Sequence, residues 1–197
     1  VWGAWMVFSF CAVAFPPAWG KMVQKTPIAE TENRMSEEER LPGRCSRESA
    51  AEQVYIVMPQ HLNSFGKLFG GQLAAWIDVI AGVVATRHCR MPITTAAIDN
   101  LRFRESVSQN ELLVLRARMT HTGRTSMEVR VDSYVEDILN GERKLVNTAF
   151  VIEVALGPDG KPCPVPPFTP CSAEEQADYD AGEKRRPIGP KKYDLYE

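Results

Sequence analysis

Positive charge is not in excess in this chain. Its 197 residues include 23 Lys and Arg against 25 Asp and Glu, for a formal net charge of -2 at pH 7. Proteins that hold nucleic acid through its phosphates carry a basic surplus, so we expect no nucleic-acid partner. The hydrophobic fraction, 44%, and the charged fraction, 24%, are ordinary for a globular domain with a sizeable core.

Paired cysteines and clustered histidines are also missing. The five cysteines are irregularly spaced, with no CxxC pair, at Cys11, Cys45, Cys89, Cys163 and Cys171. This pattern indicates neither a disulfide framework nor a zinc site. The three histidines lack the HxxxH and HExxH spacings of helical metal sites, at His61, His88 and His121. We therefore predict no metal site and no cofactor.

No uninterrupted apolar run is long enough to cross a membrane. Residues 1–20 are apolar, but no Lys or Arg precedes Lys21, and Pro16-Pro17 breaks the run short of the roughly 20 residues that a span needs. The polar run MSEEER begins at Met35. We expect residues 1–50 to be a leader whose first 34 residues lie upstream of the native start, with a signal or anchor as the alternative. No stable membrane insertion is expected.

The longest apolar stretch, FGGQLAAWIDVIAGVVA, carries a single carboxylate, Asp78, in its middle. Its apolar residues do not alternate with polar ones, which favours a helix over about residues 71–87, ended by Pro92. A helix that is apolar all round is expected in a core, so Asp78 should be partly buried. Such a carboxylate is either held by a structural hydrogen bond or tuned as a base, and the pattern alone leaves both open.

Strand patterns surround this helix. Residues 52–58 precede it, and four further runs follow it, at residues 93–103, 111–122, 125–137 and 144–156. The third run alternates, with one apolar face made by Met127, Val129, Val131 and Val135. The last run places another apolar set on a common face, Val146, Phe150, Ile152 and Val154. Hairpin turns are expected at Gly123 and at Asn140-Gly141. We predict one α+β domain over residues 51–167, an antiparallel sheet around one buried helix, and a charged tail over residues 168–197 that is mobile or lies on the surface.

Three blocks, in order, resemble a known family. HLNSFGKLFGGQLAAWID, GRTSMEV and DGKPCPVP are similar to the hotdog-fold acyl-CoA thioesterases, the type II acyl-CoA hydrolases with cytosolic long-chain and single-hotdog bacterial members. The resemblance runs from about Ala51 to Pro167 and implies a long helix wrapped by a curved antiparallel sheet. It also implies a cytoplasmic hydrolase that converts acyl-CoA to a free acid and coenzyme A, the latter being part of the substrate. The implied partner is a second copy of the chain, in a dimer at least and in a trimer of dimers in many relatives.

The resemblance also implies the catalytic residues. Asn63, in the loop before the helix, and Asp78, on the helix of a partner subunit, share the active site in such enzymes. Gly70 and Gly71 stand where the helix begins, and its free N–H groups suit the oxyanion of a thioester. Asp78 lies about two turns further along, so we expect it near the same face and assign it as general base, with direct nucleophilic attack as the alternative. Asn63 orients water or polarises the carbonyl, or it merely bonds to its own loop.

The turn Gly123-Arg124-Thr125-Ser126 offers a guanidinium, two hydroxyls and backbone amides, groups that suit phosphates. The resemblance assigns it to coenzyme A, and the alternative is a hairpin that happens to carry an Arg. Trp76 lines the acyl channel or simply packs in the core. Where many relatives have Pro-Val and then Gly-Asp, this chain has SVSQNE at residues 106–111, so its substrate preference stays open.

Two other functions compete with hydrolysis. Hotdog folds also serve as acyl-CoA-sensing modules without catalysis, but residues 1–50 lack the basic, periodic two-helix pattern of a DNA-binding partner domain. Hotdog dehydratases and hydratases generally need a catalytic His, and no His precedes His88 in the predicted helix. The presence of Asn63 and Asp78 favours hydrolysis over both.

Overall fold

The computed structural model of the protein describes residues 41–185. The predicted leader up to residue 40 and the end of the tail from residue 186 lie outside the described residues. The elements follow one another as η3 (Ser46–Glu48), β1 (Ala51–Ile56), η4 (Pro59–His61), α1 (Gly70–Cys89), β2 (Ile93–Phe103), β3 (Leu112–Thr122), β4 (Ser126–Glu136), β5 (Arg143–Ala155) and α2 (Ala173–Arg185). Every predicted strand and the predicted helix are present, with bounds that differ by one or two residues.

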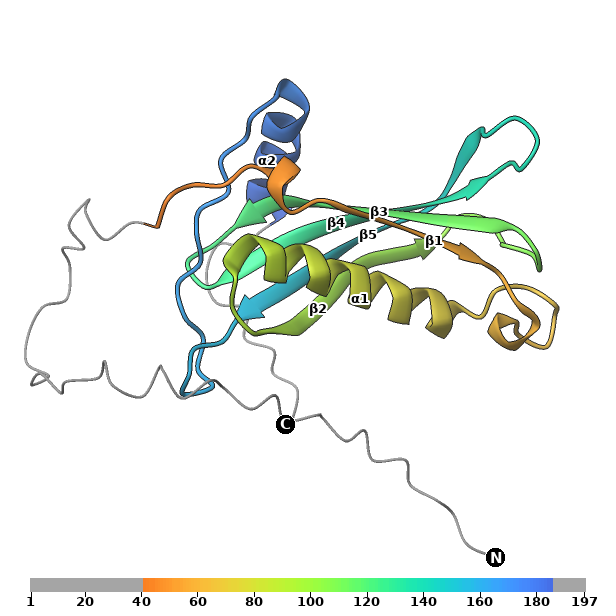
Figure 1. Cartoon of the computed structure of the whole chain (residues 1–197), viewed down its shortest axis with the longest axis horizontal. Helices are drawn as coiled ribbons and strands as arrows, with labels where there is room; N and C mark the ends of the chain where they lie inside the picture. The colour runs from red at the N-terminus through yellow and green to blue at the C-terminus, as the bar shows by residue number, and fades with distance from the viewer. Residues whose placement is uncertain (1–40, 186–197) are drawn as a thin grey trace, which may run out of the picture. The chain divides into compact units, whose positions relative to one another are not determined.

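One antiparallel sheet holds all five strands, in the order β1-β3-β4-β5-β2. It curves around α1, which lies against one of its faces (Figure 1). The predicted α+β class and the helix-in-sheet arrangement are confirmed. Because β1 and β2 form the two edges, β2 leaves one side of its backbone unpaired within the described residues 41–185.

Helix α1 ends where the sequence indicates. Arg90 takes a left-handed conformation (φ 60°) and its N–H donates to the carbonyl of Thr86, which closes the last turn before Pro92. One face of α1 is buried in the core, with Leu73, Ile77, Ile80, Ala81 and Val84. The opposite face is not: Ala75 is exposed and Val79 is 55% exposed. Burial all round, as predicted, is therefore wrong for a single chain, and α1 keeps an apolar stripe facing outward.

The core face of the sheet is set by strand pairing. Met127, Val129 and Val131 of β4 are fully buried on the face that packs against α1, as predicted. Val151 lies directly opposite Val129 and therefore shares its face, which turns Phe150, Ile152 and Val154 to the other side. The predicted common face of β5 is thus wrong. Val146 still reaches the core because the register shifts between Ser133 and Tyr134.

The predicted charged tail contains a docked helix. Helix α2 lies on the sheet face opposite α1, over the side chains that β3 and β4 turn away from the core (Figure 1). Asp178 accepts from Arg118 at 2.7 Å and from Arg130 at 3.1 Å, and Arg185 donates to Glu128 at 2.7 Å. Residues 173–185 therefore follow the surface alternative and not the mobile one, because the outward charges on the sheet match those of the helix.

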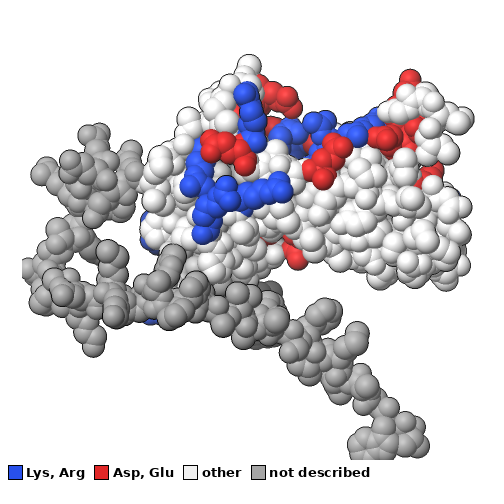
Figure 2. All heavy atoms as spheres, in the orientation of Figure 1, with Lys and Arg blue, Asp and Glu red and all other residues white. Residues whose placement is uncertain are grey.

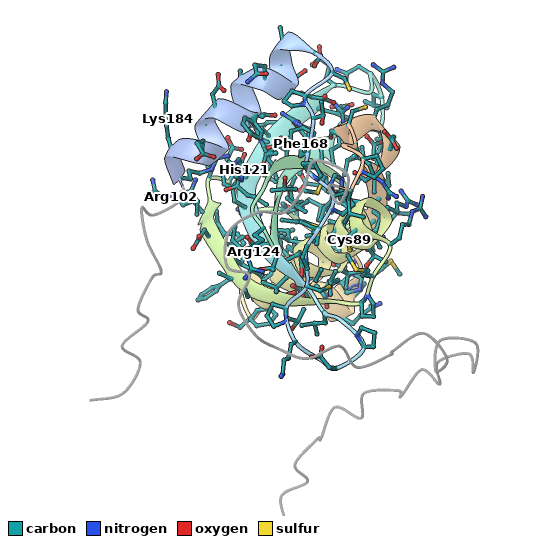
Figure 3. All side chains as sticks on the ribbon, turned by 90° about the vertical axis from the view of Figure 1, so that its left-hand side faces the viewer. Cys89, Arg102, His121, Arg124, Phe168 and Lys184 are labelled. Carbon is teal, nitrogen blue, oxygen red and sulfur yellow. The ribbon has the colours of Figure 1, made fainter. Side chains whose placement is uncertain are left out.

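Aromatic packing completes the α2 interface. Tyr179 lies against His121 and Phe168, with ring centroids 4.8 and 6.1 Å apart, and both partners are labelled in Figure 3. A Cβ on Gly182 would come within 2.8 Å of the His121 Cβ, so glycine lets α2 approach the sheet closely. Among the described residues, neither helix is long and apolar enough to cross a lipid bilayer.

Candidate active site

Asp78 lies between α1 and the edge strand β2. Its side chain is partly buried, and its Oδ1 accepts a hydrogen bond of 2.7 Å from the Thr95 hydroxyl. Thr95 itself is exposed in the single chain. The carboxylate is thus fixed on one oxygen by a neutral donor while it remains open to solvent on the β2 side. Figure 2 shows few charged side chains over the first part of α1 on the face that it presents.

A second carboxylate, Glu153, lies beneath the same threonine. Thr95 and Glu153 are direct partners in the β2–β5 ladder, and Thr95 Oγ1 lies 3.3 Å from Glu153 Oε1. Glu153 is fully buried, and its Oε2 has no hydrogen-bond partner among the described residues. Burial first, and then the charge of Asp78, raise the pKa of Glu153 to about 7, against the lowering effect of the Thr95 bond.

The sequence does not predict Glu153 as a site residue, because the alternation in FVIEVA indicates apolar residues on the core face and Glu153 on the outer face. The pairing of β5 with β4 reverses this, since Ala149, Val151, Glu153 and Ala155 share the core face. The signal that was available is the period of two from Ala149 through Val151 to Ala155, which passes through Glu153.

Asn63 belongs to a separate group of residues. Its Oδ1 accepts from the backbone N–H groups of Phe65 at 2.9 Å and Lys67 at 3.2 Å, so the side chain holds its own loop, as the structural alternative predicted. Its Nδ2 donates to no residue in the described part of the chain, which leaves an amide donor free. Asn63 and Gly70 line a cavity of about 460 Å³ at the start of α1, together with residues that include Leu73, Phe103 and Val107.

The start of α1 presents unpaired backbone donors. Gly70 and Gly71 are its first residues, no side chain caps it, and their N–H groups meet no acceptor within residues 41–185. A Cβ at Gly71 would lie 2.5 Å from the Phe69 ring, and one at Gly70 would lie 3.2 Å from the Phe103 ring. Glycine therefore permits both the aromatic packing here and the approach of a ligand to these N–H groups.

A single chain does not bring Asp78 next to these donors. Asp78 lies eight positions after Gly70, which is roughly 12 Å along a helix axis. Asp78 is also absent from the lining of the cavity that holds Asn63. We name Asp78, Thr95 and Glu153 the acid half-site, and Asn63, Gly70 and Gly71 the amide half-site. One chain carries both half-sites, but they lie apart along α1. The expectation that a single helix presents Asp78 beside the glycines at its start therefore does not hold within one chain.

The turn Gly123–Ser126 joins β3 to β4 near the acid half-site. The N–H of Gly123 donates to the carbonyl of Ser126 at 2.7 Å, and the carbonyl of Thr125 accepts from Ala155, two residues beyond Glu153. Arg124 is exposed at the end of the sheet (Figure 3) and forms no ion pair within the described residues. The backbone of the turn is thus fixed by its neighbours, while the guanidinium is free for a ligand.

Two further predictions concern residues outside these groups. Trp76 stacks on Tyr55 at 4.2 Å between ring centroids and meets the edge of His61 at 4.9 Å, so packing is its observed role. The cysteine spacing predicted no metal site, yet the fold brings the side chains of Cys45, Cys171 and Glu175 within 4.8 Å of one another. Sequence spacing hides this cluster, because its members come from opposite ends of the domain.

Comparison with known proteins identifies consistent relatives. The thioesterase superfamily model matches residues 65–141. The Bacillus subtilis (strain 168) protein named uncharacterized acyl-CoA thioester hydrolase YkhA is 39% identical over 132 residues, 67% of this chain and 77% of that protein. The cytosolic acyl coenzyme A thioester hydrolase of Rattus norvegicus is 30% identical over 139 residues, 70% of this chain but only 36% of that longer protein.

Solved structures give the same result. A hexameric acyl-CoA thioesterase in its apo form matches with a TM-score of 0.70 and 37% identity, over 74% of this chain and 93% of that one. A Staphylococcus aureus acyl-CoA hydrolase in complex with butyryl coenzyme A, coenzyme A and coenzyme A disulfide matches with a TM-score of 0.71 and 32% identity, over 73% and 88% of the two chains. That enzyme was also solved with an Asn, an Asp or a Thr replaced by Ala, and these three are separated by the same sequence intervals as Asn63, Asp78 and Thr95.

Proposed function

The chain belongs to the acyl-CoA thioester hydrolases of the thioesterase superfamily, and we propose that it hydrolyses acyl-CoA to a free carboxylic acid and coenzyme A with Asp78 as its catalytic carboxylate. Its sheet wrapped on α1 is the hotdog fold, as the resemblance implied. One observation carries the catalytic assignment: the Thr95 hydroxyl bonds to Asp78 at 2.7 Å, and the two residues have the spacing of an Asp and a Thr that were substituted in the Staphylococcus aureus enzyme.

Asp78 acts as a general base in this proposal. The Thr95 hydrogen bond fixes Oδ1, so Oδ2 is left to take a proton from a water molecule. The resulting hydroxide adds to the thioester carbonyl carbon, and collapse of the tetrahedral adduct breaks the C–S bond. The coenzyme A thiolate that leaves takes the proton from Asp78, which regenerates the carboxylate. General bases of this kind contribute on the order of 10²- to 10⁴-fold. Direct attack by the carboxylate, through an anhydride, is the alternative chemistry.

The amide half-site supplies the oxyanion donors, from a partner subunit. The free N–H groups of Gly70 and Gly71 and the Nδ2 of Asn63 are neutral donors at the start of α1, beside a largely apolar cavity, which suits a developing negative oxygen. Two α1 helices that pair about a twofold axis perpendicular to them run antiparallel, so the Asp78 of one chain approaches the helix start of the other. The exposed apolar stripe at Ala75 and Val79 supports this pairing, and the hexameric relative supports a trimer of dimers.

Coenzyme A is proposed to bind over the turn Gly123–Ser126. Arg124 is exposed and free to pair with a phosphate, and the hydroxyls of Thr125 and Ser126 are only partly buried. The reaction as written needs no metal or other cofactor, since Asp78 and backbone amides carry the proton transfer and the charge. A cytoplasmic location is part of the proposal, supported by the cytosolic enzyme of Rattus norvegicus.

The test is a turnover assay with the full chain against acyl-CoAs from short to long. We expect hydrolysis by the parent and a loss of kcat of at least about 100-fold in Asp78→Asn, with the oligomer intact by size-exclusion chromatography. Asp180→Asn, the same substitution on an exposed residue of α2, is the matched control and should retain full activity. An Asp78→Asn protein that is folded, assembled and fully active would overturn the catalytic assignment.

A further inference from the structure

The Thr95 hydroxyl stands between two carboxylates with a single hydrogen to give. Its Oγ1 lies 2.7 Å from Asp78 Oδ1 and 3.3 Å from Glu153 Oε1. A hydroxyl has one donor hydrogen and two acceptor lone pairs, so it donates to one of these oxygens and accepts from the other group only if that group bears a proton. The shorter distance to Asp78 indicates that Thr95 donates there.

Glu153 is the group that must bear the proton. It is fully buried, and its Oε2 finds no donor in the part of the chain that the structure describes. An ionised carboxylate with an unsatisfied buried oxygen beside a second carboxylate costs several kcal/mol, and protonation removes that cost. A protonated Glu153 then has an O–H that points to the nearest acceptor, Thr95 Oγ1.

We propose that Glu153 is a positioning residue for Asp78: its carboxyl O–H donates to Thr95, and this directs the only hydrogen of Thr95 onto the catalytic carboxylate. The proposal rests on the proposed function, since it assigns Glu153 a part in the same reaction. Glu153 touches no substrate in this scheme. It acts through Thr95, by holding the orientation of Asp78 Oδ1 and leaving Oδ2 to the water.

Within residues 41–185, the surroundings of Glu153 contain one charge. From α1 it faces Asp78, from β2 the neutral Thr95, and from β4 its register partner is Met127. Burial and Asp78 together raise the pKa of Glu153 to about 7, so the proton is held below neutrality and lost above it. After that loss Glu153 becomes an acceptor that competes for the Thr95 hydrogen, and Asp78 loses its fixed orientation. We therefore expect kcat to fall above pH 7 with KM little changed.

Glu153→Gln separates this role from a merely structural one. The glutamine amide donates an N–H to Thr95 at every pH, so the variant should keep the parent's kcat at about pH 6 and lose the alkaline decline. In the parent, one pH unit above a pKa of about 7 leaves about a tenth of the sites protonated, so kcat should fall about tenfold at pH 8. Released coenzyme A is quantified by chromatography, because thiol reagents themselves respond to pH.

Two controls accompany this variant. Glu128→Gln changes a buried glutamate on the opposite sheet face, held by Arg185, and should leave the pH profile of the parent unchanged. Thr95→Val removes the link, so adding Glu153→Gln to it should change neither kcat nor its pH dependence further. The unmodified protein gives a measurement that needs no variant: the infrared C=O band of a protonated carboxyl should persist at about pH 6 and vanish above about pH 8.

The outcomes are distinct. Superposable pH profiles for the parent and Glu153→Gln, or no protonated-carboxyl band near pH 6, overturn the inference. Loss of kcat at every pH in an assembled Glu153→Gln also overturns it, since a donor at this position would then not suffice. Failure of the proposed function is visible separately, because Asp78→Asn would remain active whatever Glu153 does. An inactive Asp78→Asn beside a Glu153→Gln identical to the parent removes only the positioning role.

Discussion

Replacing Glu153 by glutamine should stabilise the folded protein at alkaline pH by an amount that follows from the burial of this side chain. Burial and Asp78 raise the pKa of Glu153 from 4.5 to about 7 in the folded state. Between these values the folded state binds a proton that the unfolded chain has released, so the free energy of unfolding falls as pH rises through this window. Above pH 7 the loss is complete. At about 1.4 kcal/mol per pKa unit, it amounts to about 3 kcal/mol.

Urea unfolding of the parent and Glu153→Gln at fixed protein concentration measures this, since dissociation of an oligomer makes stability depend on concentration. The variant's advantage should be about 2 to 3 kcal/mol larger at about pH 8.5 than at about pH 5. If the difference between the two proteins is the same at both pH values, Glu153 does not keep its proton on folding. Both the burial argument and the assignment of its hydrogen bond would then be refuted.

Three further predictions follow from other parts of the fold. Asp178→Asn removes the negative charge that Arg118 and Arg130 share under α2 and replaces one of its two acceptor oxygens by an amide donor, so it should cost about 1 to 3 kcal/mol in urea unfolding. A cost below about 0.5 kcal/mol would show that α2 is held by its aromatic contacts instead. Burial lowers the pKa of His88, so His88 stays neutral in the folded state while the unfolded chain takes up a proton. The free energy of unfolding therefore falls as pH drops through about 6.5, by up to about 1.4 kcal/mol per pH unit. His88→Gln, which keeps a donor for the Pro166 carbonyl, should abolish this slope in thermal melts. Gly71→Ala should lower kcat at least about tenfold, because the added methyl obstructs the free N–H groups at the start of α1; it should cost little stability, because the Phe69 ring that it displaces is 56% exposed. Gly82→Ala, whose Cβ meets only Ile93 at 3.6 Å, is the control. Equal kcat in both variants would exclude the helix start from catalysis.

Local periodicity was sufficient to predict most of the fold. The absence of alternation identified α1, and alternation in β4 identified the core residues Met127, Val129 and Val131, because these signals depend only on neighbours along the chain. Helix α2 was not predicted, because its sequence is charged and has no apolar face of its own. Asp178 and Arg185 are held by partners on β3 and β4, and no local pattern in the sequence of the tail indicates these partners.

The candidate site was predictable in its parts and not in its arrangement. Asn63, Asp78 and the two glycines came from the resemblance, but the distance along α1 between Asp78 and the helix start is what divides them into two half-sites. The sheet face on which Glu153 lies depends on the register between β5 and its neighbours, because a shift of one residue exchanges the two faces of the strand. Such shifts occur at bulges, which leave no clear mark in the sequence of the strand that carries them.

Because the two half-sites lie apart along α1, hydrolysis in the proposed mechanism requires two chains to associate. In the proposed mechanism a newly folded chain holds every catalytic group and is nevertheless inert, because its own base and its own oxyanion donors never meet on one thioester. Activity per chain should therefore decline on dilution at constant substrate. It should also return in part when inactive Asn63→Ala chains are mixed with inactive Asp78→Asn chains, since each mixed pair assembles one undamaged site from the sound half of each parent.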